Sequence, residues 1–303
     1  MNLLGSLWVR LIQLAARKTF DFWQFLGFHI TPNHYYQPIP DTRTLNSDLW
    51  ENPGKMPGID LREDYQLNLL KTFEENFGGE FNSFSRKKTS TPHEFYSDNN
   101  SFAIVDAAIL YCMVRHFKPA KIFEIGSGFS TFVSAKAALV NEKETGAKTE
   151  LVAFEPYPNE IIKKGFEGLS KLEAKIIQQV DTSAFLALKE NDILFIDSSH
   201  VLKTGSDVQY EYLEILPRLN KGVIIHCHDI FLPLEYPEKW LKKDRWFWTE
   251  QYLLQAFLAF NESYEVLWGG SFMNFKHGDL LEKTFKSCNK KDWPGSFWLR
   301  KIK

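Results

Sequence analysis

The stretch Lys121-Ile-Phe-Glu-Ile-Gly126-Ser-Gly128-Phe-Ser-Thr131 joins a short apolar strand to a glycine turn and then to the start of a helix. The glycines allow a tight turn in which a ligand approaches the backbone, and the helix that follows offers free N–H groups. A dinucleotide fingerprint G-x-G-x-x-G would need a third glycine where Thr131 stands, which argues against a dehydrogenase. Glu124 places an acid before the first glycine, and this acid suits a cationic ligand group better than a pyrophosphate.

Strands and helices alternate around this turn from about residue 101 onward. Short apolar segments separated by helices indicate a parallel sheet that is covered on both faces, so the fold class is α/β. A final antiparallel hairpin could come from two late strands at 264–268 and 297–300. The five earlier strands are expected at 121–125, 150–155, 174–180, 192–197 and 222–226, and the helices at 102–116, 131–140, 159–172, 182–188, 207–219 and 250–260.

Acidic residues follow the first three expected strands. Glu155 ends the second strand, where a carboxylate can accept both hydroxyls of a ribose. Asp181 follows the expected third strand, where it could meet an adenine amino group. Together with Glu124 for an ammonium, these acids describe S-adenosylmethionine (SAM) as the ligand. Each feature alone has a simpler interpretation, because strand-end acids are often helix caps.

The glycine turn resembles motif I of class I SAM-dependent methyltransferases, with Glu155 as the acid after the second strand. The resemblance covers roughly residues 100–303. It implies a Rossmann-like sheet of seven mostly parallel strands, in which the last strand runs antiparallel to its neighbours. The SAM-binding residues that it implies are Glu124, Gly126, Ser127, Gly128, Glu155 and Asp181.

The fourth and fifth strands end in side chains that can bind a metal or move a proton. Asp197 and Asp229 should face one crevice and could give oxygen ligands to one hard cation. His228 could add a nitrogen ligand, which would tilt the preference toward Mn, Fe, Co or Zn. His200 lies on the loop after Asp197, and an imidazole is well matched to proton removal near neutral pH.

This arrangement resembles metal-dependent O-methyltransferases of the macrocin O-methyltransferase and cephalosporin hydroxylase-like group, with uncharacterised bacterial relatives. By position, Asp197 and Asp229 match the residues that hold a divalent ion there, with Mg or Mn as the expected metal. His200 matches the histidine that serves as base in the macrolide-sugar members, whereas His228 stands where the family usually has an acid. The resemblance implies O-methylation of a hydroxyl on a sugar, a glycosylated metabolite or a secondary metabolite.

Several alternatives stay open at this point. Asp197 could line the SAM pocket without a metal, and His200 could only hydrogen-bond the ligand. The enzyme would then be a metal-independent N- or O-methyltransferase for small molecules. A non-catalytic SAM-binding assembly protein is a further alternative. The aromatic insertion at 231–248 could cover the substrate or simply cover the sheet.

Residues 1–100 are expected to form an appendage to the methyltransferase domain at 101–303. The apolar pattern near the start is interrupted by Arg10, Arg17 and Lys18, so no run reaches the roughly 18–20 residues that a spanning helix needs. This helix could pack on the main domain or on a partner subunit of a homo-oligomer. It could instead lie on a membrane surface through residues 1–26. Five prolines between residues 32 and 57 then predict an extended arm.

Composition excludes some classes of function. The 303 residues carry 36 Lys and Arg against 38 Asp and Glu, so a strongly basic surface for nucleic acid is not expected. Three cysteines far apart in the sequence argue against a disulfide framework and favour a reducing, cytoplasmic location.

Overall fold

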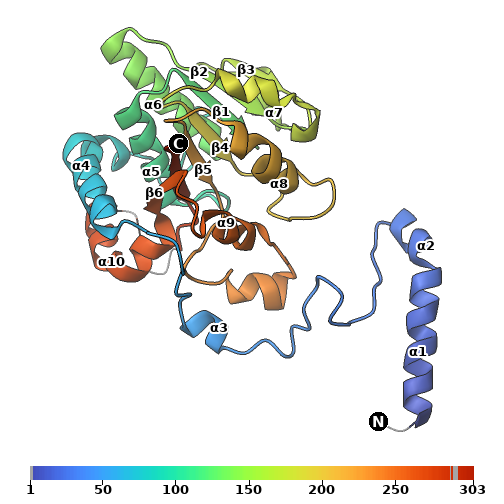
Figure 1. Ribbon diagram of the computed structural model, residues 1–303. Coiled ribbons are helices and arrows are strands. Elements are labelled where there is room, and N and C mark those ends of the chain that lie inside the picture. Colours follow the sequence, from blue (N-terminus) through green and yellow to red (C-terminus); the bar gives the residue numbers. More distant parts are fainter. Residues whose placement is uncertain (1–2, 287, 289–292) are drawn as a thin grey trace. The chain divides into compact units, whose positions relative to one another are not determined.

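The computed structural model describes residues 3–286, 288 and 293–303 (Figure 1). The chain divides into two compact units. The small unit comprises residues 1–52 and 237–247, and the large unit comprises residues 53–236 and 248–303. The large unit begins well before the boundary at residue 101 that the sequence suggested. The reason is that helix α4 (Glu63–Phe81) buries Leu69 and Phe73 in its core.

The large unit is built on one seven-stranded sheet with the strand order β3-β2-β1-β4-β5-β7-β6. The first five strands are parallel, and β7 runs antiparallel to both β5 and β6. The expected Rossmann-like sheet with an antiparallel last strand is therefore confirmed. The strands are β1 (Lys121–Ile125), β2 (Glu150–Phe154), β3 (Lys171–Glu173), β4 (Ile193–Ile196), β5 (Ile224–Cys227), β6 (Tyr264–Gly269) and β7 (Phe297–Lys301).

Helices cover both faces of the sheet because successive strand residues point to opposite sides. In β1, Ile122 belongs to one hydrophobic cluster, whereas Phe123 and Ile125 belong to the other. The first cluster includes α4, α5 (Ile104–Phe117), α6 (Phe129–Thr145) and α10 (Gly270–Thr284). The second includes η2 (Thr182–Ala187), α8 (Asp207–Tyr210), η3 (Glu211–Ile215) and α9 (Glu250–Leu258). The short helices α7 (Glu160–Lys164), η1 (Ile177–Gln179) and η4 (Leu216–Arg218) complete the large unit.

Two expected elements differ from the structure. The third strand was expected at 174–180 but lies at Lys171–Glu173, because its ladder with β2 ends where Phe154 pairs with Glu173. The helix expected at 159–172 is shorter in the structure. Helix α7 covers only Glu160–Lys164, because Gly165 follows it with a φ of +71°, and residues 171 and 172 belong to β3.

The small unit contains α1 (Leu3–Lys18), α2 (Phe20–Phe25), α3 (Asp48–Glu51) and η5 (Trp240–Asp244). Part of the aromatic insertion packs here on the proline-rich arm. Arg245 Nη1 donates to Thr42 Oγ1 at 2.6 Å, and the Lys242 ammonium lies 4.8 Å from the ring centroid of Trp50. Among the described residues, no helix combines the length and the apolar character that crossing a bilayer requires.

Candidate active site

The glycine turn after β1 passes directly against the end of β4. Gly126 has a φ of +86°, and a Cβ atom built there would lie 2.1 Å from the carbonyl oxygen of Asp197. Only glycine tolerates both the backbone conformation and this close approach. Gly128 then begins α6, and its N–H donates to Thr131 Oγ1 at 2.9 Å. The threonine that replaces the third fingerprint glycine therefore closes the turn.

Glu155 connects the end of β2 to this turn. Its Oε2 accepts the N–H of Ser127 at 3.1 Å, and its Oε1 accepts the N–H of Tyr157 at 2.8 Å. Each carboxylate oxygen keeps a second lone pair for a ligand. Glu155 also lines a cavity, and pockets for small ligands have volumes of roughly 300–1,000 Å³. That cavity has a volume of 410 Å³ and is also lined by Gly126, Ile177 and Ser198.

Glu124 is fully buried beneath the turn. Its Oε1 accepts the hydroxyl of Ser130 at 2.5 Å, and its Oε2 has no hydrogen-bond partner among the residues that the structure describes. Burial raises the pKa of Glu124 to about 8, although hydrogen bonds from Ser130 and Thr131 oppose the shift. A buried acceptor with a free oxygen is costly unless a ligand donates to it.

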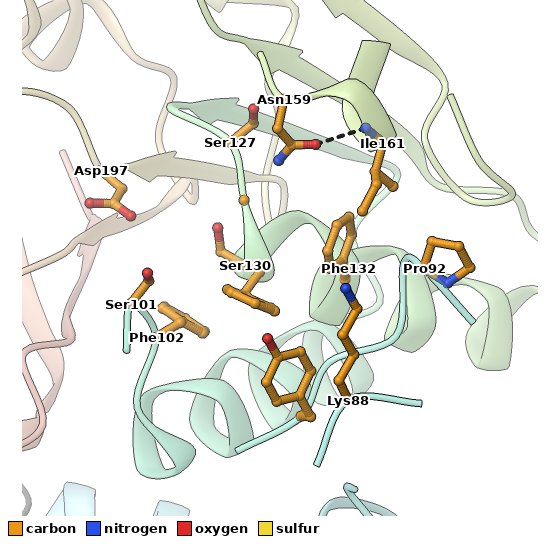
Figure 2. Close-up of a pocket in the computed structure, with 13 residues that line it drawn as sticks. Lys88, Pro92, Ser101, Phe102, Ser127, Ser130, Phe132, Asn159, Ile161 and Asp197 are labelled. Carbon is orange, nitrogen blue, oxygen red and sulfur yellow. Dashed lines mark hydrogen bonds between the residues drawn. The ribbon is translucent and has the colours of Figure 1, made fainter. Parts of the chain in front are cut away.

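A second cavity, of 350 Å³, opens on the other side of the glycine turn. Figure 2 shows Asp197 at one end of this cavity and Lys88 and Pro92 at the other, with Ser127 of the turn and Ser130 of α6 between them. Asp197 lines both cavities. The end of β4 is therefore the place where the two hollows meet.

Asp197, His200 and Asp229 form a compact cluster at the ends of β4 and β5. His200 Nε2 lies 3.3 Å from Asp197 Oδ1 and 3.5 Å from Asp229 Oδ2. One ligand atom from each of the three residues lies within 4.8 Å of the others, which is close enough to hold one metal ion. The crevice expected from the sequence is thus formed by these side chains.

The opposite side of the His200 ring is held by Glu250, which the sequence did not reveal. His200 Nδ1 lies 2.9 Å from Oε2 of the buried Glu250, whose Oε1 accepts the hydroxyl of Tyr212 at 2.9 Å. His200 and Asp229 both have left-handed backbones, with φ of +60° and +54°. Such conformations in residues other than glycine are uncommon and cluster at functional sites.

His228 lies beside the same two carboxylates, and its second ring nitrogen faces a third carboxylate. Its Nδ1 is 3.7 Å from Asp197 Oδ1 and 3.5 Å from Asp229 Oδ1, and its Nε2 is 3.7 Å from Oδ2 of Asp106. Neither nitrogen makes a hydrogen bond within the described part of the chain. Asp106 is held in place by the N–H groups of Gly295 and Ser296, at 3.1 and 3.0 Å. His228 is therefore buried, and both of its ring nitrogens lack a hydrogen-bond partner among the described residues.

The electrostatics of the cluster follow from this geometry. Burial opposes ionisation of Asp197, but His228 and then His200 outweigh it and lower the pKa of Asp197 to about 2. Burial also disfavours the charged form of His200, yet the carboxylates of Asp197 and Glu250 raise its pKa well above the usual value. The histidines and carboxylates of the cluster thus stabilise one another's charged forms.

Asp181 differs from its expected position. It follows η1 rather than a strand, is exposed, and accepts the N–H of Ser183 at 2.8 Å as the N-cap of η2. It is not among the residues that line either cavity. The expectation that Asp181 stands at the tip of the third strand is wrong, because β3 ends at Glu173.

A family model described as a methyltransferase domain matches residues 123–230. An uncharacterized protein of Archaeoglobus fulgidus is 31% identical over 178 residues, which cover 55% of this chain and 77% of that protein. Among solved structures, the SAH-bound methyltransferase PaMTH1 of Podospora anserina has 16% identity and a TM-score of 0.41, over 81% of this chain and 98% of that one. A structure of CmcI with SAH has 14% identity and a TM-score of 0.37, over 73% and 85% of the two chains.

Proposed function

Because the chain belongs to the class I SAM-dependent methyltransferase superfamily, we propose that it methylates an acceptor hydroxyl at a divalent metal centre. The observation that carries this proposal is the convergence of Asp197, His200 and Asp229 within 4.8 Å, beside the glycine turn of the methyltransferase domain. The acceptor class is a sugar, a glycosylated metabolite or a secondary metabolite, and it rests on the resemblance to the macrocin O-methyltransferase group.

SAM would extend across the glycine turn from one cavity to the other. Glu155 has free lone pairs for the ribose hydroxyls in the 410 Å³ cavity. The unpartnered Oε2 of Glu124 would receive the ammonium of the methionine moiety, which would favour the charged form of this acid. Ser127 and Gly128 would offer backbone groups to the same moiety.

The donor set fits a divalent ion. Asp197 and Asp229 would supply oxygen ligands, and His228 Nδ1, which lies 3.7 and 3.5 Å from their carboxylate oxygens, would supply a nitrogen ligand. His200 Nε2 would then remain free to move a proton. A mixed set of oxygen and nitrogen donors favours Mn, Fe, Co or Zn over Mg. When bound, the ion would lower the pKa of the acceptor hydroxyl and, through its charge, favour the neutral form of His200.

His200 would act as the general base. Its Nε2 would take the hydroxyl proton while the oxygen attacks the methyl carbon, and the C–S bond would break with its electron pair remaining on sulfur. The products are the methyl ether, S-adenosylhomocysteine (SAH) and a proton on His200. Glu250 would hold the ring through Nδ1 and compensate the imidazolium charge. Positioning would provide much of the rate, because the sulfonium is already a good leaving group.

Chelation tests the metal part of this proposal. The purified protein is analysed for bound metals by mass spectrometry, and acceptors are screened with labelled SAM before and after treatment with a chelator. Loss of transfer on chelation and its return on adding Mn²⁺ would support the proposal. A metal-free O- or N-methyltransferase is the second candidate, because His200 and His228 already lie 3.5 and 3.7 Å from the carboxylates of Asp229 and Asp197. A rate that survives chelation, in a protein without bound metal, would favour that candidate.

A further inference from the structure

The N-terminal helical segment, residues 8–30, exposes an unusual amount of apolar and aromatic surface. Trp8 and Ile12 of α1 are each 65% exposed, and Phe25 of α2 is 87% exposed. No residue of α2 is buried. Burying such side chains is strongly favourable, so this surface is expected to have a binding partner.

Two of the three cationic side chains of α1 lie opposite its apolar face, and the third, Lys18, is the last residue of the helix. Trp8, Leu11, Ile12 and Ala15 follow the spacing i, i+3, i+4 and i+7, which places them together on one side of a helix. Arg10, Gln13 and Arg17 recur at i, i+3 and i+7 on the opposite side. The helix is therefore amphipathic, with an apolar face and a cationic stripe.

Charge identifies the kind of partner. Residues 1–30 contain Arg10, Arg17 and Lys18 against the single acid Asp21, which leaves the rest of the chain with 33 cations and 37 acids. The positive charge is thus concentrated in the segment that also exposes the aromatic rings. A second copy of this segment carries the same net positive charge and offers no complement to it, whereas anionic lipid headgroups do.

We propose that residues 8–30 bind in the plane of an anionic phospholipid surface. Trp8, Leu11 and Ile12 enter the boundary between headgroups and acyl chains, and Arg10 and Arg17 remain among the phosphates. This inference is independent of the proposed metal chemistry, since the segment contains none of the residues assigned to it.

The test uses the full-length protein and sedimentation with vesicles. Binding should be stronger to phosphatidylcholine vesicles that contain phosphatidylglycerol than to phosphatidylcholine alone. Leu11→Glu should lower the partition coefficient about 10- to 100-fold, the range expected for losing a buried leucine. The matched control is Leu213→Glu in the large unit, because Leu213 is 52% exposed and Leu11 is 50% exposed. Replacing both Arg10 and Arg17 by Gln should lower binding to the anionic vesicles about fivefold per residue.

Three outcomes would overturn the proposal. The first is Leu11→Glu binding anionic vesicles as well as the wild type does, and the second is a wild type that binds neither kind of vesicle. The third is a wild type that forms dimers without lipid while Leu11→Glu is monomeric and neither form binds vesicles, which would make a second copy the partner. SAH affinity, measured in parallel, should be the same in all variants and separates this test from that of the catalytic proposal.

Discussion

Replacing Glu155 by alanine should weaken SAH binding about 10- to 150-fold. This range corresponds to the roughly 1.5–3 kcal/mol of a hydrogen bond to a charged group. The carboxylate of Glu155 holds the N–H groups of Ser127 and Tyr157 and still has lone pairs that face the 410 Å³ cavity. Alanine removes the acceptor for the ribose hydroxyls and also releases the glycine turn at Ser127.

A second substitution at the same position separates charge from shape. Glu155→Gln keeps the size of the side chain and one acceptor oxygen, so a neutral hydrogen bond can replace the charged one. The expected loss of affinity is only about 2- to 13-fold, from roughly 0.5–1.5 kcal/mol. The order of affinity should therefore be wild type, glutamine and alanine.

Calorimetric titration with SAH measures these affinities without an acceptor. Glu160→Ala is the matched control, because Glu160 is exposed, pairs with Lys163 and lines neither cavity. Thermal unfolding of each variant shows that the fold is kept. A folded Glu155→Ala protein with wild-type affinity would refute the assignment of Glu155, and so would an equal loss in Glu160→Ala.

Three further predictions concern the acids and the histidine of the site. His200→Ala should lower the transfer rate about 10²- to 10⁴-fold, the usual contribution of a general base, with metal content and SAH affinity near wild type; a parallel loss of metal would make His200 a ligand instead. Asp197→Asn should lose bound metal and activity together, and metal analysis showing full occupancy would contradict this. Burial raises the pKa of Glu124 from 4.5 to about 8, so the folded protein binds this proton more tightly than the unfolded chain. The resulting stability is complete below pH 4.5 and is lost as the pH rises through 8. In urea titrations without ligand, the free energy of unfolding of the wild type should therefore fall over this window relative to that of Glu124→Gln. A difference between the two proteins that stays constant with pH would be evidence against this prediction.

The parts of the fold that sequence reasoning could predict are those set by local pattern. The strand at Lys121–Ile125 and the turn at Gly126 follow from a short apolar run and from glycine. The crevice of Asp197 and Asp229 follows from parallel strands that end at one edge. The third strand could not be placed, because its three residues are defined only by their ladder with β2.

The residue that sequence reasoning missed is Glu250. It lies 50 positions after His200 in the sequence, and an acid in the first turn of a helix usually needs no further explanation. Only the folded structure reveals its contact with His200. The backbone carbonyl of His200 accepts the N–H groups of Thr249 and Glu250, and these hydrogen bonds hold the start of α9 against the loop. Asp106, in the first turn of α5, was hidden for the same reason.

The position of β7 has a consequence for how the protein is made on the ribosome. This strand comes last of the seven in the sequence, yet it lies between β5 and β6 and is the only strand of the described sheet that bonds to β6. While the chain is still being synthesised, β5 has an open apolar edge and β6 has no neighbour to join. The nascent sheet must therefore wait for residues 297–301 before it can close. Until then its exposed edge is open to pairing with other chains, so the ability to avoid aggregation during translation depends on a segment that contributes nothing to the chemistry.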